Sequence, residues 1–281
     1  MTYGIPDDIE ASVEAALAED VGKGDLTAAL IPHKAEAEAD ITVREAAVIC
    51  GIPWVDEVFR QLDTEVQIEW LVADGERCEA NTKICKLQGK ARSLLTGERT
   101  ALNFLQTLSG TATVTARYCD AVSATSAKIL DTRKTIPGMR LAQKYAVRCG
   151  GGTNHRVGLF DAILIKENHI AASQNLRDAV ARATQLSFGA MIEVEIETLE
   201  QLDEALDTGA SRVLLDNFTL DMLREAVARR DKHPAHRKML EASGGITLAN
   251  IGEVAATGVD LISIGALTKH VAAIDYSMLV T

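Results

Sequence analysis

The second half of the chain alternates short apolar, β-prone runs with longer segments whose apolar residues recur at helical spacing. The short runs lie at 128–131, 162–166, 191–196, 212–216, 239–243 and 261–265, and the helical patterns lie at 139–149, 175–186, 198–209, 220–230 and 248–258. Strands that alternate with helices indicate a parallel sheet with crossover helices, and nearly continuous apolar strands are typical of sheets covered on both faces. The pattern predicts an α/β fold with an incomplete (β/α) barrel of about six parallel strands; a doubly wound sheet is the alternative.

The first hundred residues follow a different pattern. A helical segment at about 7–19 precedes several short strand-like runs, which turn-forming dipeptides separate. This arrangement predicts a small α+β domain, and residues 97–122 predict a long, mostly helical connection. We therefore expect an N-terminal α+β domain over residues 1–110 and a barrel domain over residues 111–266.

Composition limits the classes of function. The 281 residues carry a net charge of −11 at pH 7, which argues against general binding to nucleic acid or to an anionic membrane, since both require a basic surface. No apolar run approaches the length of a membrane span, and the first twenty residues lack the pattern of a signal peptide. The five cysteines are scattered and form no CxxC pair, so we expect reduced thiols in a cytoplasmic protein.

Positive charge is nevertheless concentrated in one stretch. Between Lys128 and His169 there are eight lysine or arginine residues and three acidic ones, a net charge of +5. The segment DTRKTIPGMR, Asp131–Arg140, begins with the last residue of the first predicted barrel strand and continues past it. A surface loop would tolerate these cations, whereas a site for a small polyanion would need them.

Polar residues and glycines stand at the end of every predicted barrel strand. They are Thr132, Arg133 and Lys134, then Lys166, Glu195, Asp216, Ser243, Gly244, Gly245 and Gly265. Ligands of parallel α/β proteins bind beyond the carboxyl ends of the strands, so these residues are expected to meet at one site. The arginine and the lysines suit carboxylates or phosphates. The two acids suit ribose hydroxyls or a Mg²⁺ ion that bridges phosphates, and the Ser-Gly-Gly turn offers backbone amides to a terminal phosphate.

The sequence CGGGTNHRVGLFDA, residues 149–162, lies between the first two barrel strands. Its glycines do not form GxGxxG, so a dinucleotide site is a weak interpretation, and a helix stop with a mobile loop explains them equally well. His155 is a candidate proton donor, and Arg156 is a second arginine for an anionic ligand. The other histidines form no HExxH or Cys/His metal set in the sequence.

Longer segments of the chain resemble the quinolinate phosphoribosyltransferase family, the decarboxylating nicotinate-nucleotide pyrophosphorylases of NAD synthesis. These segments are DTRKTIPGMR, YAVRCGGGTNHRVGLFDAILIKENHI, EVEIETLEQLDEAL, VLLDNF, SGGI, SIGALTKH, EDVGKGDLTAALIP and LLTGERTALNFLQTLSGTAT. The resemblance implies a sandwich-like N-terminal domain, rejoined by the chain's end at 267–281, and an open barrel. It also implies phosphoribosyl transfer from phosphoribosyl pyrophosphate to quinolinate, giving nicotinate mononucleotide, pyrophosphate and CO₂.

The resemblance further implies a role for each candidate residue. Quinolinate is implied to be surrounded by Arg133, His155, Arg156 and Lys166, and Lys134 is implied to lie between quinolinate and the donor. The ribose and the Mg²⁺-bound pyrophosphate are implied to face Glu195 and Asp216. The 5′-phosphate is implied to be held by Ser243, Gly244, Gly245 and Gly265. Thr132 counts among the substrate-binding residues, and the implied catalytic groups are Lys134, Glu195, Asp216 and His155. No organic cofactor is implied. The family also implies a homodimer in which Arg99, of the GER motif, reaches the partner's site.

The chemistry of these substrates fits the basic stretch independently of the resemblance. Both substrates are strongly anionic, and two unit charges about 4 Å apart interact by about 4 kcal/mol at an effective dielectric of 20. Bringing the two substrates together therefore needs dense positive charge around them. The reaction also needs a proton after CO₂ leaves, and this proton could come from Lys134 or His155. The alternatives are a molybdenum-transport-associated relative with another acceptor, a barrel lyase using Lys166 or Lys134 as a Schiff-base nucleophile, and a catalytically silent phosphate-binding protein.

Overall fold

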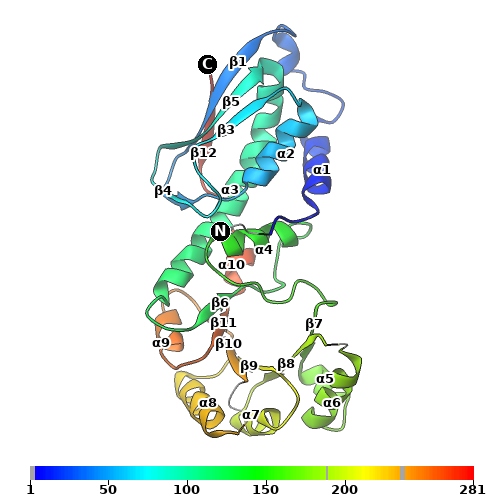
Figure 1. Ribbon diagram of the computed structural model, residues 1–281, viewed down its shortest axis with the longest axis vertical. Coiled ribbons are helices and arrows are strands. Elements are labelled where there is room, and N and C mark those ends of the chain that lie inside the picture. Colours follow the sequence, from blue (N-terminus) through cyan, green and yellow to red (C-terminus); the bar gives the residue numbers. More distant parts are fainter. Residues whose placement is uncertain (1–3, 188, 235–237) are drawn as a thin grey trace. The chain divides into compact units, whose positions relative to one another are not determined.

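The computed structural model describes residues 4–187, 189–234 and 238–281, and these residues fall into two compact units. The first unit holds the residues up to Ala116 together with Thr135–Gly151 and Leu267–Thr281. The second unit holds Arg117–Lys134 and Gly152–Ala266. Each unit has its own main sheet, and Figure 1 labels the elements of both.

The first unit is a four-stranded antiparallel sheet with helices on one face (Figure 1). In sheet order the strands are β12 (Tyr276–Val280), β1 (Glu36–Val43), β5 (Thr82–Lys90) and β3 (Gln67–Trp70), and a separate ladder joins β2 (Ala47–Val48) to β4 (Arg77–Cys78). The helices are α1 (Ile9–Val21), α2 (Ile52–Leu62), α3 (Ala91–Ala121), α4 (Arg140–Cys149) and α10 (Ala266–Lys269), with a 3-10 turn at Ala28–Leu30. This architecture confirms the prediction of an N-terminal domain that mixes strands and helices.

Alternation along the strands creates the core of this unit. In β1 the side chains of Ala39, Ile41 and Val43 are buried, and their neighbours in sequence are more exposed. The buried face packs against apolar residues of α2 and α3, and Trp54 and Phe59 are the largest fully buried side chains of α2. A sheet with one apolar face is stable only when such a layer covers it.

Helix α4 contributes to the same core, although the sequence analysis placed its residues in the barrel domain. The ring of Tyr145 lies edge-on to that of Trp54, with 5.4 Å between the centroids, and its hydroxyl donates to Asp74 at 2.7 Å. Residues of the chain's end, Ile274 and Tyr276, are buried there as well. An amphipathic pattern predicts that a helix has a buried face but not which domain covers that face.

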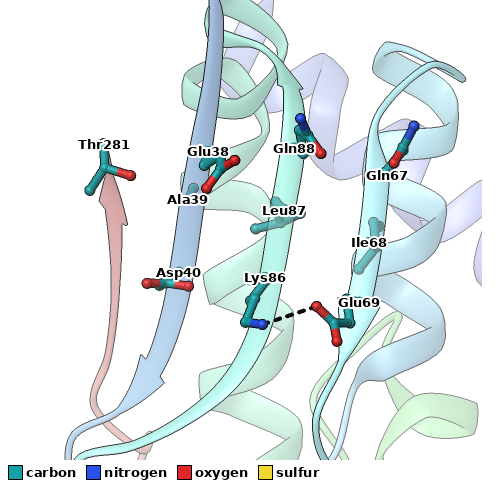
Figure 2. Close-up of a pocket in the computed structure, with 10 residues that line it drawn as sticks. All are labelled: Glu38, Ala39, Asp40, Gln67, Ile68, Glu69, Lys86, Leu87, Gln88 and Thr281. Atoms are coloured by element: carbon teal, nitrogen blue, oxygen red, sulfur yellow. Dashed lines mark hydrogen bonds and ion pairs between the residues drawn. The ribbon is translucent and has the colours of Figure 1, made fainter.

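The other face of the four-stranded sheet is polar. Figure 2 shows the side chains of Glu38, Asp40, Glu69 and Lys86 along a groove on this face, where Lys86 Nζ donates to Glu69 at 3.2 Å. Exposed cross-strand ion pairs of this kind add little to stability. The groove contains no residue that the sequence analysis named as a candidate, and its composition is typical of a solvated sheet face.

The second unit is an open α/β barrel. Its six parallel strands follow the order β6 (Lys128–Leu130), β11 (Leu261–Ser263), β10 (Met239–Ser243), β9 (Arg212–Asp216), β8 (Met191–Ile196) and β7 (Ala162–Ile165). The helices α5 (Glu167–Ala171), α6 (Leu176–Leu186), α7 (Leu199–Leu206), α8 (Leu220–Lys232) and α9 (Ile251–Ala255) connect them. The strand order from β7 to β11 never reverses, unlike that of a doubly wound sheet, and β6 lies beside β11. The predicted incomplete barrel is confirmed, with its open edge between β6 and β7.

Two barrel elements are shorter than the sequence pattern indicates. Helix α9 covers Ile251–Ala255 within the predicted 248–258, because a turn in which Thr247 N donates to Asn250 Oδ1 precedes it. Strand β11 ends at Ser263, before Gly265. Among the residues that the structure describes, no helix is both long enough and apolar enough to cross a membrane.

We predict that Gly110→Ala destabilises the first unit. A Cβ atom at Gly110, inside α3, would collide with the backbone carbonyl oxygen of Ala272. Alanine in a helix interior gains about 0.5–1 kcal/mol over glycine, but overpacking against a rigid backbone costs about 1–3 kcal/mol or more, so the collision should decide the sign. Urea unfolding of the variant and the unchanged protein would measure this loss.

The matched control is Gly252→Ala in α9, where an added Cβ meets no heavy atom within 4 Å. That variant should be neutral or slightly more stable. A Gly110→Ala protein as stable as the control would contradict the close approach at Ala272.

Candidate active site

One pocket opens at the carboxyl ends of the barrel strands. Because side chains alternate along a strand, residues two apart, such as Leu164 and Lys166 of the β7 segment, face the barrel interior together. The pocket is lined by Thr132, Arg133, Lys134, His155, Arg156, Leu164, Lys166, Glu195, Leu214, Glu241, Ser243 and Ser263, all in the second unit. This position is where ligands of parallel α/β barrels bind.

Most of the candidate residues from the sequence therefore meet in one place. Eight of them line the pocket: Thr132, Arg133, Lys134, His155, Arg156, Lys166, Glu195 and Ser243. Asp216, Gly244 and Gly265 directly adjoin lining residues, and Gly245 follows Gly244 in the chain. Asp216 is paired in register with Ser243 across the sheet, and Gly265 lies beside Lys134. Arg99 lies on α3 in the first unit.

The pocket has four cations: Arg133 and Lys134 follow strand β6, Arg156 lies on the loop after Gly152, and Lys166 follows strand β7. Burial lowers the pKa of the Arg156 guanidinium, and the like charge of Arg133 lowers it further. Lys166 Nζ lies 2.5 Å from Glu195 Oε2, so one carboxylate offsets part of the positive charge. Cations gathered this closely repel one another, and an anionic ligand would relieve that repulsion.

Asp216 provides a second acid at the rim. Burial raises the pKa of its carboxyl group; the nearby Lys166 and Lys134 act to lower it, whereas Glu197 and Glu167 act to raise it. Asn217 Nδ2 also donates to Asp216 at 2.8 Å. Carboxylates at this rim suit a hard divalent cation, because Mg²⁺ takes oxygen ligands from carboxylates, phosphates and water.

The loop that follows Gly152 brings His155 and Arg156 to the open edge of the barrel. Thr153 pairs with Leu130 of β6 through backbone hydrogen bonds, so the returning chain extends the sheet beside β6. The buried carboxylate of Asp131 accepts hydrogen bonds from His155 N at 2.8 Å and Asn154 Nδ2 at 2.7 Å. These bonds hold the loop in place and turn the two following side chains towards the pocket.

The imidazole of His155 has a close polar neighbour on each side. Its Nδ1 accepts from the backbone N–H of Arg156 at 2.8 Å, and its Nε2 lies 2.9 Å from Glu193 Oε2. The side chain is 8% exposed. A ring held in this way is poorly placed to pass a proton to a ligand in the pocket.

A buried charged cluster that sequence reasoning missed lies below His155. It consists of Glu193 on β8, Arg212 on β9 and Glu241 on β10, which all face the barrel interior. Arg212 Nη1 donates to Glu241 Oε2 at 3.0 Å. Burial, and then the charge of Glu193, raise the pKa of Glu241 to about 7, and burial also raises the pKa of Glu193. The available signal was a charged residue within each apolar run: inside the run for Glu193 and Glu241, and at its start for Arg212.

Glycines shape the side of the pocket formed by β10 and β11. Gly244 and Gly245, directly after Ser243, have φ values of 95° and 61°, in the left-handed region where successive backbone N–H groups form a concave anion site. At Gly265 a Cβ atom would lie 3.1 Å from Lys134 Cδ, so glycine there leaves room for the lysine.

The fold and the pocket define a class of protein: an open α/β barrel with cationic side chains gathered at its strand ends, as a site for an anionic ligand requires. The sequence profile of the quinolinate phosphoribosyl transferase C-terminal domain matches residues 111–279, and that of the N-terminal domain matches residues 25–109. The chain therefore belongs to the quinolinate phosphoribosyltransferase family, and the resemblance seen in the sequence is confirmed.

Individual relatives are similar over nearly their whole lengths. A Bacillus subtilis protein described as a probable carboxylating nicotinate-nucleotide pyrophosphorylase is 44% identical over 265 residues, which is 94% of this chain and 90% of the relative. A Nicotiana glauca quinolinate phosphoribosyltransferase (decarboxylating) is 40% identical, over 96% of this chain and 82% of the relative. The solved nicotinate-nucleotide pyrophosphorylase of Francisella tularensis matches with a TM-score of 0.95 and 47% identity, over 99% of this chain and 98% of that one.

The titration of Glu241 predicts a pH-dependent difference in stability. Its pKa is about 7 in the folded chain and about 4.3 when unfolded, so between these values the folded state binds the proton more tightly. The stabilisation is complete below the unfolded pKa and is lost as the pH rises through 7. Glutamine mimics the protonated acid, so Glu241→Gln should gain roughly 1–3 kcal/mol relative to the unchanged protein between pH 5 and pH 8.

Unfolding midpoints of both proteins at matched pH values measure this difference. A difference that stays constant across the range would show that Glu241 does not titrate there.

Proposed function

We propose that this chain transfers the phosphoribosyl group of phosphoribosyl pyrophosphate to quinolinate and releases CO₂, giving nicotinate mononucleotide and pyrophosphate for NAD synthesis. The observation that carries the proposal is the pocket itself, where Arg133, Arg156 and Lys166 gather beside Glu195 at the strand ends. Relatives of 40% identity or more over most of this chain carry the names of this activity.

The acceptor is proposed to bind between the two arginines. Arg133 and Arg156 each present a planar fork of donors that matches a carboxylate, and quinolinate has two adjacent carboxylates. The mutual repulsion that lowers the pKa of Arg156 would be offset by such a dianion. Nicotinate, which lacks the C2 carboxylate, would relieve only part of it.

The donor is proposed to lie along the β8–β10 side of the pocket. Ser243 with the left-handed Gly244 and Gly245 would take the 5′-phosphate on backbone amides. Glu195 and Asp216 would face the ribose and stabilise the positive charge that develops at C1 as pyrophosphate leaves. Glu195 and Asp216 are also the residues that would hold Mg²⁺, which when bound neutralises pyrophosphate.

The chemistry then follows from positioning. The pyridine nitrogen attacks C1 of the ribose, and the bond from C1 to the pyrophosphate oxygen breaks. The ring nitrogen becomes cationic, and its positive charge stabilises the electron pair that remains at C2 when that carboxylate departs as CO₂; a proton then takes up this pair. A proton must then reach C2, and we assign its delivery to Lys134 rather than His155, because Nδ1 of His155 accepts from the Arg156 backbone and Nε2 lies 2.9 Å from the carboxylate of Glu193.

The Schiff-base alternative is less well supported by the pocket. A lysine nucleophile of this kind is a neutral amine in an apolar or cationic surrounding. Lys166 instead has a side chain that is 43% exposed and an ion pair with Glu195 at 2.5 Å. Anion pairing therefore explains this lysine better than nucleophilic catalysis.

The assembly and location belong to the same proposal. We infer a homodimer in which Arg99 completes the partner's pocket, since its side chain is 59% exposed and its ion pair with Glu98 is long, at 3.8 Å. The five cysteines are all thiols rather than disulfides, which supports a reducing compartment such as the cytoplasm.

A product assay tests the reaction. Purified protein with Mg²⁺, quinolinate and phosphoribosyl pyrophosphate should release nicotinate mononucleotide, pyrophosphate and CO₂ in equal amounts. Nicotinate should be a poor acceptor, because one of the two carboxylates that the arginines bind is missing. Equal use of nicotinate and quinolinate, measured by chromatography of the nucleotide product, would rule out the acceptor assignment.

Complementation tests the shared site. Arg99→Ala and Lys134→Ala should each be inactive alone, whereas mixed dimers would contain one site that keeps both side chains. With random subunit exchange, about a quarter of the sites should be intact. The control is a mixture of Arg133→Ala and Lys134→Ala, which alter the same pocket and should restore nothing. If subunit exchange is verified and activity does not return, Arg99 acts within its own chain or not at all.

A further inference from the structure

The charged cluster inside the barrel forms a chain of contacts that ends at the pocket. Arg212 Nη1 donates to Glu241 Oε2 at 3.0 Å, and His155 Nε2 lies 3.5 Å from Glu241 Oε1 and 2.9 Å from Glu193 Oε2. Glu193 and Glu241 have no exposed surface. Burying a charged carboxylate is unfavourable even when it is paired, so two of them in such a place indicate a role in the protein's function.

The two sides of the His155 ring determine where its proton lies. Nδ1 accepts a hydrogen bond from the backbone N–H of Arg156, so this nitrogen carries no proton. A neutral ring therefore carries its proton on Nε2, which lies 2.9 Å from Glu193 Oε2 in an ion-pair contact. A ring with protons on both nitrogens would place an N–H against the N–H of Arg156. The geometry thus selects the neutral Nε2–H form.

The same contacts fix the backbone from which Arg156 extends. The N–H of Arg156 is held by the ring, the N–H of His155 is held by Asp131, and the Arg156 guanidinium donates to the Ala162 carbonyl at 3.3 Å. The ring in turn cannot rotate without losing Glu193. The orientation of the arginine in the pocket therefore depends on an acid buried beneath it.

A metal ion is a poorer explanation of the cluster. Ligand atoms of His155, Glu193 and Glu241 lie within 4.8 Å of one another, as a metal site requires. However, the guanidinium of Arg212 already bonds Glu241, and the protonated Nε2 lies 2.9 Å from Glu193. A cation at that point would face both a guanidinium and an N–H group, which disfavours it.

We propose that Glu193, Arg212 and Glu241 are positioning residues that hold His155 as the Nε2–H tautomer and thereby fix Arg156 for the carboxylates of the acceptor. The inference rests on the proposed function only for the identity of that acceptor. Glu193 and Arg212 are not among the residues that line the pocket, whereas Glu241 is. Loss of Glu193 should therefore weaken acceptor binding and leave donor binding nearly unchanged.

The test compares Glu193→Met with Glu193→Gln. Methionine fills the space but accepts no strong hydrogen bond, whereas the glutamine oxygen still accepts from Nε2–H. By calorimetry, with each ligand alone, Glu193→Met should bind quinolinate about tenfold more weakly, and phosphoribosyl pyrophosphate within about twofold of the unchanged protein. Glu193→Gln should recover most of the quinolinate affinity.

The matched control is Val194→Ala, which removes buried packing on the opposite face of the same strand. It should lower stability and leave both affinities within about twofold. Arg212→Met tests the other end of the chain of contacts and replaces Glu193→Met if that variant does not fold. An equal loss for both ligands, or no recovery with glutamine, would overturn the proposal.

Nitrogen NMR of the ligand-free, ¹⁵N-histidine-labelled protein gives a readout that needs no substrate. His155, assigned by its absence in His155→Asn, should show a bare Nδ1 and a protonated Nε2, and Glu193→Met should change this pattern. A proton on Nδ1 in the unchanged protein, or an identical pattern in both, would refute the network. If the protein fails to bind quinolinate but shows the expected tautomer, the proposed function fails and the network stands.

Discussion

Repulsion among cations is the constraint on which the barrel mouth depends. Arg133, Lys134, Arg156 and Lys166 line one pocket, and only part of their charge is offset by Glu195. Like charges about 4 Å apart repel by about 4 kcal/mol at an effective dielectric of 20, so flexible side chains would move apart into water. The parallel sheet prevents this, because each cation is anchored at a strand end or on the loop paired to β6. An anion bound among these cations would offset their mutual repulsion, which favours its binding.

Sequence patterns predicted the elements that carry this pocket and most of the residues in it. Six apolar runs separated by helical patterns indicate parallel strands, and residues at their carboxyl ends must then meet, which brings Arg133, Lys166 and Glu195 together. The incomplete barrel follows from the number of runs, but its open edge between β6 and β7 does not. That edge depends on the loop after Gly152, whose pairing of Thr153 with Leu130 has no periodic signal.

Two features were beyond the reach of pattern reasoning, and for the same physical reason. A strand covered on both faces is apolar throughout, so the sequence does not show which residues point into the barrel and which towards the helices. Glu193, Arg212 and Glu241 therefore read as isolated charges in apolar runs. Helix α4 likewise has a clear buried face, yet only the fold shows that its Tyr145 packs on Trp54 in the first unit.

Buried carboxylates beneath an anion site need an explanation, since they would repel the ligand above them. The geometry supplies one: Arg212 Nη1 donates to Glu241, and His155 Nε2 lies 2.9 Å from Glu193, so each carboxylate has a partner that offsets its negative charge. The raised pKa of Glu241, about 7, reduces that charge further at neutral pH. The cluster thus holds the imidazole ring of His155 and the side chain of Arg156 in fixed positions at the pocket. An apolar barrel floor would avoid the cost of burial but would leave His155 without a partner and Arg156 without a defined orientation.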